Sequence, residues 1–184
     1  MSEHKNTLKL TLNDIKKIDN GLWTVGQFFD ADSFEYIKNS VISSAEDLYM
    51  PSPASELRKE MVWMRDGILE ELTDCLIESM DMLSSVVGIT LKFGQVRVWQ
   101  DKPGYMIPFH EDDISSYAHF QMYLDSGQEN IGTTWYTSNG RHTCPFIPNT
   151  GYLTICNERL PHGMLETVDG KNRLSVYATF KQIT

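Results

Sequence analysis

The second half of the chain consists of short segments of β-branched and aromatic residues, with turn residues between them. Residues 93–100 alternate between apolar and polar side chains, and the Asp-Lys-Pro-Gly sequence at 101–104 predicts a turn directly after them. Further segments share this strand-like composition: residues 117–124, 133–137, 152–156 and 173–180. Strands this short and this closely spaced predict an antiparallel sandwich or a small barrel.

The first half of the chain is predicted to be mainly helical. After a strand-like segment at residues 21–29, Asp32 or Ser33 can cap a helix that ends before Pro51. A second helix is predicted over residues 66–87, because apolar residues recur there at helical spacing until a glycine stops the pattern. The sequence therefore predicts a fold that is mainly β with N-terminal helices.

The length of 184 residues fits one domain with a sizeable core and is short for two. We expect residues 1–88 to form an N-terminal strand and helices that support a β core over residues 89–184. Residues 61–67 lack a clear periodicity, and they fit either a lid or a buried connection.

The composition of the chain indicates which kinds of partner and which cellular compartment to expect. Acidic residues outnumber basic ones by 25 to 16, and the resulting net charge of −9 argues against a nucleic-acid partner. The N-terminus has no secretory signal, and no apolar stretch is long enough to span a membrane. Cys75, Cys144 and Cys156 form no CxxC pair, so a reduced, cytoplasmic protein is expected. The oligomeric state stays open.

His110, Asp112 and His162 form the most informative constellation in the β half. His110 and Asp112 are two residues apart in an extended segment, so their side chains point to the same face of the strand and can meet one ion. His162 follows, in a Pro-His-Gly sequence that predicts a turn. Two imidazoles and a carboxylate are the ligands of non-haem Fe(II) enzymes, although their spacing alone also suits Mn, Ni or Zn.

Arg173 and Ser175 are a second same-face pair, on a segment that reads as a strand. An arginine that points into a β core carries a buried charge, which needs an anionic partner. The guanidinium can bind a carboxylate with two hydrogen bonds, and the serine hydroxyl can add another. The alternative is that Arg173 faces solvent and pairs with a surface carboxylate.

The order of these five residues resembles that of the Fe(II)- and 2-oxoglutarate-dependent oxygenases, over about residues 93–181. The resemblance implies a double-stranded β-helix, a jelly-roll or cupin-like barrel. It implies that His110, Asp112 and His162 bind Fe(II), and that Arg173 and Ser175 bind the remote carboxylate of 2-oxoglutarate. The implied reaction is hydroxylation of a substrate by O2, with release of succinate and CO2.

Residues 120–125 resemble the strand that follows the first iron ligands in prolyl-hydroxylase-like members of that family. This resemblance implies that Tyr123 faces the co-substrate, with His119 and Gln121 on the same face. Members of that branch often carry lysine where Arg173 stands, so their substrate cannot be transferred to this chain. A protein side chain and a small metabolite both remain possible substrates.

Two other functions fit parts of the pattern. A cupin-type metal enzyme would use two histidines and a carboxylate without 2-oxoglutarate, and it would not need Arg173. A non-catalytic β-sandwich binding module would keep its fold and affinity without His110 or Asp112. The remaining polar and aromatic candidates are either pocket or core residues (Trp99 and Trp135) or possible substrate contacts (Arg141, His142 and Arg159).

Overall fold

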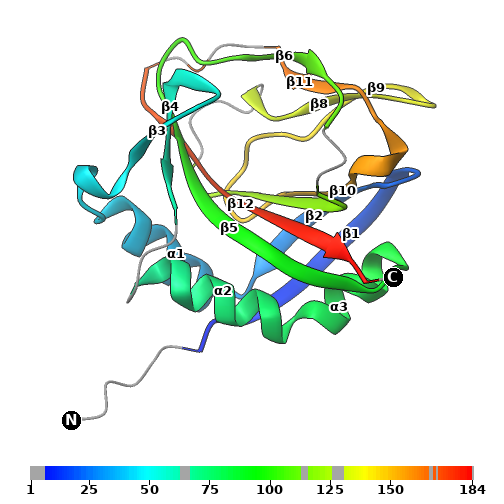
Figure 1. The fold of residues 1–184 in the computed structure, drawn as a ribbon, viewed down its shortest axis with the longest axis horizontal. Helices are drawn as coiled ribbons and strands as arrows, with labels where there is room; N and C mark the ends of the chain where they lie inside the picture. The colour runs from blue at the N-terminus through cyan, green and yellow to red at the C-terminus, as the bar shows by residue number, and fades with distance from the viewer. Residues whose placement is uncertain are drawn as a thin grey trace.

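The computed structural model describes residues 7–62, 67–112, 116–125, 131–165, 168 and 170–183. The described chain forms two antiparallel sheets, with three helices along the outer face of the larger one (Figure 1). The helices are α1 (Ala31–Ile42), α2 (Ile68–Glu78) and α3 (Met80–Val87). Short 3-10 helices lie at η1 (Glu46–Leu48) and η3 (Cys156–Glu158).

The large sheet has eight strands. In spatial order they are β1 (Leu10–Asp19), β2 (Leu22–Phe29), β10 (Gly151–Ile155), β7 (Ala118–Tyr123), β12 (Arg173–Gln182), β5 (Leu91–Asp101), β4 (Ser55–Met61) and β3 (Met50–Ser52). The small sheet has four, in the order β6 (Ile107–His110), β11 (His162–Met164), β8 (Thr134–Thr137) and β9 (Gly140–Thr143). The mainly β fold with antiparallel sheets that the sequence predicts is therefore confirmed.

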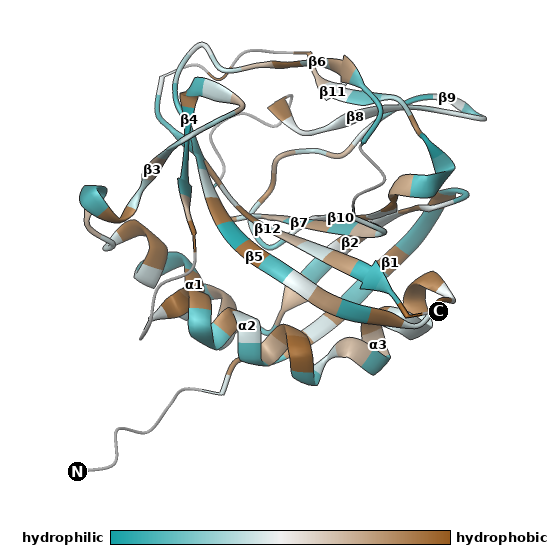
Figure 2. Cartoon of the chain, viewed as in Figure 1, coloured by the Kyte–Doolittle hydropathy of each residue, from teal (hydrophilic) through white to brown (hydrophobic). Residues whose placement is uncertain are grey.

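The two faces of the large sheet differ in polarity because successive side chains of a strand point to opposite sides. Val98, Val176 and Met122 lie side by side on β5, β12 and β7, and all three belong to the apolar core beneath the helices. Figure 2 shows hydrophobic residues along the helices and at alternating positions of β5. The intervening residues, such as Ser175 and Gln121, are polar and buried on the opposite face. That face is where a functional site can form.

The helices differ from the sequence prediction at two points. Asp30 caps α1, because its Oδ1 accepts a hydrogen bond from the backbone N–H of Ser33 at 2.9 Å; Asp32 lies inside the helix. The helix predicted over residues 66–87 is divided at Ser79 into α2 and α3. The apolar pattern continues across the division, so periodicity does not reveal it. Gly88 ends α3 in the left-handed conformation, as the sequence predicts.

The N-terminal half contributes more strands than its sequence suggests. β1 lies at one edge of the large sheet, and the β3–β4 hairpin lies at the other. Edge strands bury fewer side chains, so β1 has a polar sequence, and β4 turns charged residues inward. Residues 63–66 of the proposed lid or connection lie outside the described residues. No helix in the described part of the chain has the length and apolarity needed to cross a membrane.

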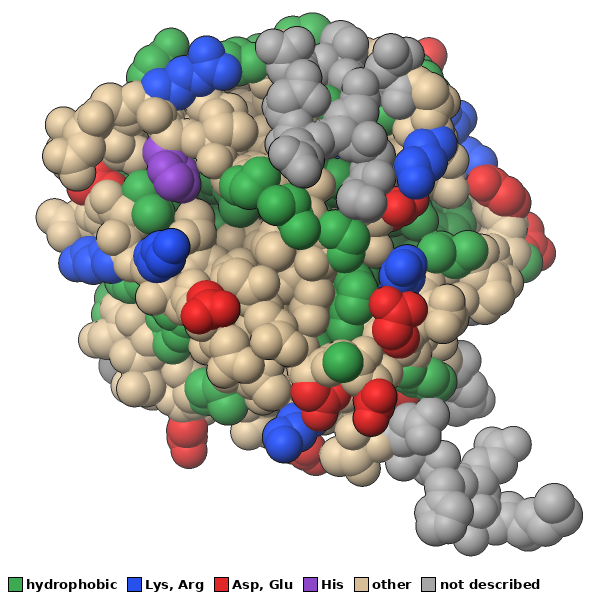
Figure 3. Space-filling view, turned by 180° about the vertical axis from the view of Figure 1, so that it is seen from behind, with side chains coloured by type: hydrophobic (Ala, Val, Ile, Leu, Met, Phe, Trp, Pro, Cys, Tyr) green, Lys and Arg blue, Asp and Glu red, His purple; other side chains and the backbone are tan. Residues whose placement is uncertain are grey.

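Charged side chains are mixed on the surface. On the face shown in Figure 3, Lys and Arg side chains are dispersed among acidic and apolar ones. Among the described residues of that face there is no continuous basic surface of the kind that binds nucleic-acid phosphates.

We predict that Phe120→Ala lowers the free energy of unfolding by about 3–5 kcal/mol. Phe120 is fully buried, and its ring lies 4.4 Å from that of Phe28, edge to face, in the core beneath the helices. Urea unfolding followed by circular dichroism measures the change. The control is Ile42→Ala, which removes a side chain that is 55% exposed and should change the value by less than about 0.5 kcal/mol.

Candidate functional site

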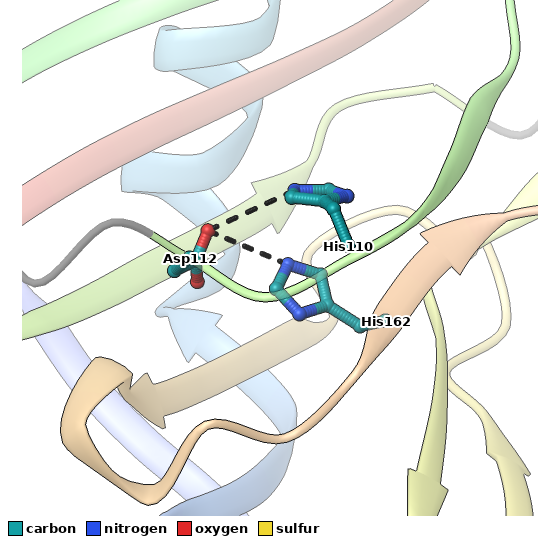
Figure 4. Close-up of side chains that lie close together, drawn as sticks. All are labelled: His110, Asp112 and His162. Carbon is teal, nitrogen blue, oxygen red and sulfur yellow. Dashed lines mark ion pairs between the residues drawn. The ribbon is translucent and has the colours of Figure 1, made fainter.

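The structure brings His110, Asp112 and His162 together at the small sheet (Figure 4). His110 ends β6 and His162 begins β11, and the two residues are direct partners in the antiparallel pairing of these strands. Asp112 follows the end of β6 by two residues. Its Oδ1 lies 3.9 Å from Nε2 of His110 and 3.5 Å from Nε2 of His162. Two imidazole nitrogens and a carboxylate oxygen therefore converge on one region.

His162 lies on a strand, although Pro161 and Gly163 beside it predict a turn. Gly163 serves a different purpose, which is close approach of two backbones. A Cβ atom at Gly163 would lie 2.7 Å from the carbonyl oxygen of Ile107 in β6. Only glycine therefore lets β11 approach β6 closely enough to bring the two histidines side by side.

Both histidines are oriented by backbone carbonyl groups. Nδ1 of His110 lies 3.0 Å from the carbonyl oxygen of Pro108, and Nδ1 of His162 lies 2.9 Å from that of Leu160. Because each Nδ1–H donates to a carbonyl oxygen, the neutral ring carries its lone pair on Nε2, the atom that faces Asp112. Metal-binding histidines are commonly oriented in this way.

The electrostatic environment keeps Asp112 ionised. Burial alone raises the pKa of Asp112, but the hydrogen bonds and positive charge of His119 and His162 outweigh burial and hold the pKa well below its usual range. Burial lowers the pKa of His162, yet the hydrogen bond and charge of Asp112 raise it above its ordinary value. Protons therefore compete with a metal ion for His162 over a wider pH range than they would for an ordinary histidine.

Arg173 is buried, as an inward-pointing arginine would be, and its partner is Asp101. Arg58, Asp101 and Arg173 are neighbours in register across β4, β5 and β12, so their side chains share the inner face of the large sheet. Asp101 accepts hydrogen bonds from Nε and Nη2 of Arg58 at 2.6 and 3.1 Å. Nη1 of Arg173 lies 3.4 Å from Oδ2 of Asp101.

This row of residues carries more positive than negative charge. Two buried guanidinium groups, of Arg58 and Arg173, share the single carboxylate of Asp101. Nη1 of Arg173 also contacts Sδ of Met164, whereas its Nε and Nη2 are buried without a hydrogen-bond partner. Buried donors of a charged group are rarely left unpaired, so an anion that binds beside Arg173 would satisfy them.

Ser175 and Tyr123 lie near Arg173 on the same face. Ser175 is fully buried, and its hydroxyl accepts a hydrogen bond from Nε2 of Gln121 at 3.0 Å. The Tyr123 ring lies 5.5 Å from Cζ of Arg173, and its hydroxyl accepts a hydrogen bond from the backbone N–H of Thr133 at 3.1 Å. The predicted carboxylate-binding residues thus lie together inside the molecule.

A cavity of about 170 Å³ lies against the three converging residues. Its wall includes a series of stacked groups: the Arg58 guanidinium lies 3.8 Å from the Trp99 ring, which stacks on Tyr177 at 3.9 Å. The Tyr177 ring in turn lies 5.1 Å from His119. Arg173, Ser175 and Tyr123 are not among the lining residues, although Gln121 of the lining donates a hydrogen bond to Ser175.

The remaining candidates divide between pocket, core and surface. Trp99 lines the cavity, whereas Trp135 is fully buried against Tyr152 and belongs to the core. Arg159 is exposed and lies 4.0 Å from Glu111. Arg141 and His142 lie on β9, and neither they nor Arg159 lines the cavity.

Sequence reasoning assigned no role to Arg58, Asp101 or His119. Asp101 belongs to a turn signal, and Arg58 lies in a polar segment with no predicted structure. Their pairing depends on the register of three strands, which the sequence does not show. For His119 the sequence offers one indication of a role: it is expected on the same strand face as Tyr123.

Comparisons with known proteins place the fold. No protein-family model and no curated protein matches the sequence. A prolyl-4-hydroxylase structure from Pseudomonas putida is 19% identical, covers 89% of this chain and 94% of its own, and has a TM-score of 0.69. An oxidoreductase of the 2OG-Fe(II) oxygenase family from Burkholderia pseudomallei is 13% identical, covers 88% of this chain and 84% of its own, and has a TM-score of 0.67. HygX from Streptomyces hygroscopicus, with nickel and 2-oxoglutarate bound, is 11% identical, covers 89% of this chain and 83% of its own, and has a TM-score of 0.68.

The chain has the fold of 2-oxoglutarate and Fe(II) oxygenases. The resemblance to this family that the sequence suggests is thereby confirmed at the level of structure. Identities of 11–19% show the fold alone. The function has to be argued from the residues of this chain.

We predict that binding of Co(II) releases protons and becomes tighter as the pH rises through the raised pKa of His162. The sign follows because the ion binds the neutral imidazole, so protons compete with it only below that pKa. Asp112 adds no pH dependence near neutrality, since its pKa is lowered. Calorimetric titration in two buffers of different ionisation enthalpy measures the protons released.

The control for this titration is His142→Asn, which changes a histidine outside the cavity and should leave the pH dependence intact. An affinity for Co(II) that does not change between about pH 5 and 8, where histidines titrate, would contradict the prediction.

Proposed function

We propose that the protein is an Fe(II)- and 2-oxoglutarate-dependent dioxygenase that hydroxylates a protein side chain or a small metabolite. In this proposal the two sheets form a double-stranded β-helix around the site. The observation that carries the proposal is the convergence of His110, Asp112 and His162 in a molecule that also buries a guanidinium with unpaired donors, that of Arg173. The fold shared with 2-oxoglutarate and Fe(II) oxygenases supports it.

His110, Asp112 and His162 would hold the Fe(II). Two histidines and a carboxylate with further positions open are the ligand set of non-haem Fe(II) oxygenases, and the orientation of both Nε2 atoms fits it. Bound iron and 2-oxoglutarate supply the oxidising power for O2-dependent hydroxylation, with release of succinate and CO2. The role of the protein is to hold these groups in place and to keep water away from them.

The balance of buried charge favours a dianionic co-substrate. Arg58 and Arg173 are balanced by Asp101 and Asp112, and Arg97 pairs with the buried Glu60, so positive and negative charges are equal in number. A divalent ion adds two positive charges, and 2-oxoglutarate carries two negative ones. The loaded site is therefore neutral, which lowers the cost of keeping charged groups away from water.

Arg173 and Ser175 would bind the remote carboxylate of 2-oxoglutarate, with Tyr123 beside them. Nε and Nη2 of Arg173 are the buried donors that this carboxylate would satisfy. The cavity of about 170 Å³ is smaller than the roughly 300–1,000 Å³ of pockets for drug-sized ligands, and Arg173 does not line it, so 2-oxoglutarate would reach Arg173 only after lining side chains move. His110 has the most exposed side chain of the three metal ligands, 44% against 17% for Asp112 and 10% for His162. A substrate would therefore approach from the side of His110.

The two other functions fit the buried residues less well. A cupin-type metal enzyme without 2-oxoglutarate has no need for a guanidinium with buried, unpaired donors. A non-catalytic binding module has no need for two histidines whose Nε2 atoms are both turned toward one carboxylate. Arg173 argues against the first alternative, and His110 with His162 argues against the second.

Anaerobic addition of Fe(II) and 2-oxoglutarate to the purified protein is expected to produce the visible absorption band of the iron–2-oxoglutarate complex. Arg173→Ala should weaken the affinity for 2-oxoglutarate, because a charged hydrogen bond contributes about 1.5–3 kcal/mol. Absence of the band in folded wild-type protein would refute the proposed function. Unchanged affinity in Arg173→Ala would refute the role of Arg173. A screen coupled to succinate release then identifies the substrate.

We predict opposite effects of two substitutions on the stability of the ligand-free protein. Asp101→Asn leaves two buried guanidinium groups without a carboxylate and should lower the free energy of unfolding by about 3–5 kcal/mol. Arg173→Met removes a buried charge while Asp101 keeps both hydrogen bonds to Arg58, so stability should be unchanged or higher. Urea unfolding measures both.

The control for these variants is Arg159→Met. The Arg159 side chain is 67% exposed, so its replacement should alter stability by less than about 0.5 kcal/mol. A loss of stability in Arg173→Met as large as that in Asp101→Asn would show that Arg173 is a structural residue.

A further inference from the structure

His119 contacts Asp112 through a different carboxylate oxygen from the one that faces His110 and His162. It lies on β7 in the large sheet and is buried. Its Nδ1 lies 3.1 Å from Oδ2 of Asp112, whereas the other two histidines face Oδ1. The carboxylate of Asp112 is therefore held by the large sheet through one oxygen and faces the small sheet with the other.

The second ring nitrogen of His119, Nε2, also has a neighbour. It lies 3.4 Å from Sγ of Cys156, and the ring centroid of His119 lies 5.1 Å from that of Tyr177, with the two planes tilted by 58°. The Cys156 thiol is buried, and its S–H can donate a hydrogen bond to Nε2. The neutral ring then carries its hydrogen on Nδ1 and donates it to Oδ2 of Asp112.

Asp112, His119 and Cys156 also lie close enough to suggest a second metal site. The geometry favours hydrogen bonding instead. His119 turns one ring nitrogen toward Asp112 and the other toward Cys156, so the two neighbours lie on different sides of the ring. A single ion would need both neighbours at the same nitrogen. The three residues therefore form a hydrogen-bonded chain that ends at Oδ2 of Asp112.

We propose that His119 is a positioning residue that engages Oδ2 of Asp112 and thereby presents Oδ1 alone to the metal ion. This inference rests on the proposed function, because it concerns the same metal site. A carboxylate with both oxygens free can bind a metal through either oxygen or through both. With Oδ2 held by His119, Asp112 occupies one position, and the others stay open for ligands that react.

The test uses Co(II) as the metal, without 2-oxoglutarate, and two substitutions of His119. His119→Leu removes the donor, and His119→Asn replaces it, because the side-chain amide nitrogen of Asn occupies about the position of Nδ1. Loss of such an outer contact commonly weakens metal binding by about 10- to 100-fold. We expect this loss in His119→Leu and recovery of most of the affinity in His119→Asn.

The absorption spectrum of bound Co(II) separates positioning from a loss of stability, because its intensity and band positions report the coordination of the ion. At saturating Co(II), we expect a changed spectrum in His119→Leu and the wild-type spectrum in His119→Asn. The matched control is Thr179→Val, which alters a buried polar residue paired with His119 in register on β12. It should keep the affinity and spectrum of the wild type.

The outcomes distinguish the two proposals. A wild-type protein that is folded but binds no Co(II) would overturn the proposed metal site and this inference with it. Wild-type protein that binds Co(II), with the same affinity and spectrum in His119→Leu, would overturn the inference alone. Equal losses in His119→Leu and His119→Asn would overturn it too, since the donor would then have no special role. Thermal unfolding of each variant confirms that the protein is folded.

Discussion

The alternation of side chains across the large sheet is the constraint on which the rest of the structure depends. One face supplies the apolar core under the helices, and the other must bury polar and charged residues between the two sheets. Those groups are most stable where they are paired, and Arg173 is an exception because two of its donors have no partner in the described structure. Asp101 holds Arg58 at the edge of the sheet, and Asp112 is held near its centre by His119. The site thus results from the ion pairs and hydrogen bonds that stabilise polar side chains on the inner face of the large sheet.

The sequence reveals those parts of the site that depend on local geometry. His110 with Asp112, and Arg173 with Ser175, are two apart on extended segments, and that spacing alone predicts a shared face. Long strands with clear alternation, such as β5 and β12, are predicted for the same reason. The helix at residues 66–87 is predicted in extent but not in its division, because the apolar pattern does not change at Ser79.

The parts that the sequence does not reveal depend on contacts between distant segments. Arg58 meets Asp101 only because β4 pairs with β5, and the polar sequence of β4 gives no sign of this. Gly163 predicts a turn by its type, yet the structure uses it for close approach to β6. The difference between these two uses of glycine lies in the neighbouring strand, which a reading of local sequence does not include.

The pairing of His110 with His162 has a consequence for folding. The two residues are far apart in the chain, and everything between them must return before β11 can lie beside β6. Such non-local contacts form late, because the entropy of closing the loop is lost before the contact compensates for it. We therefore expect the proposed metal site to assemble near the end of folding. An ion that binds there would stabilise the pairing of β6 with β11. Its affinity would therefore depend on the stability of the whole β core.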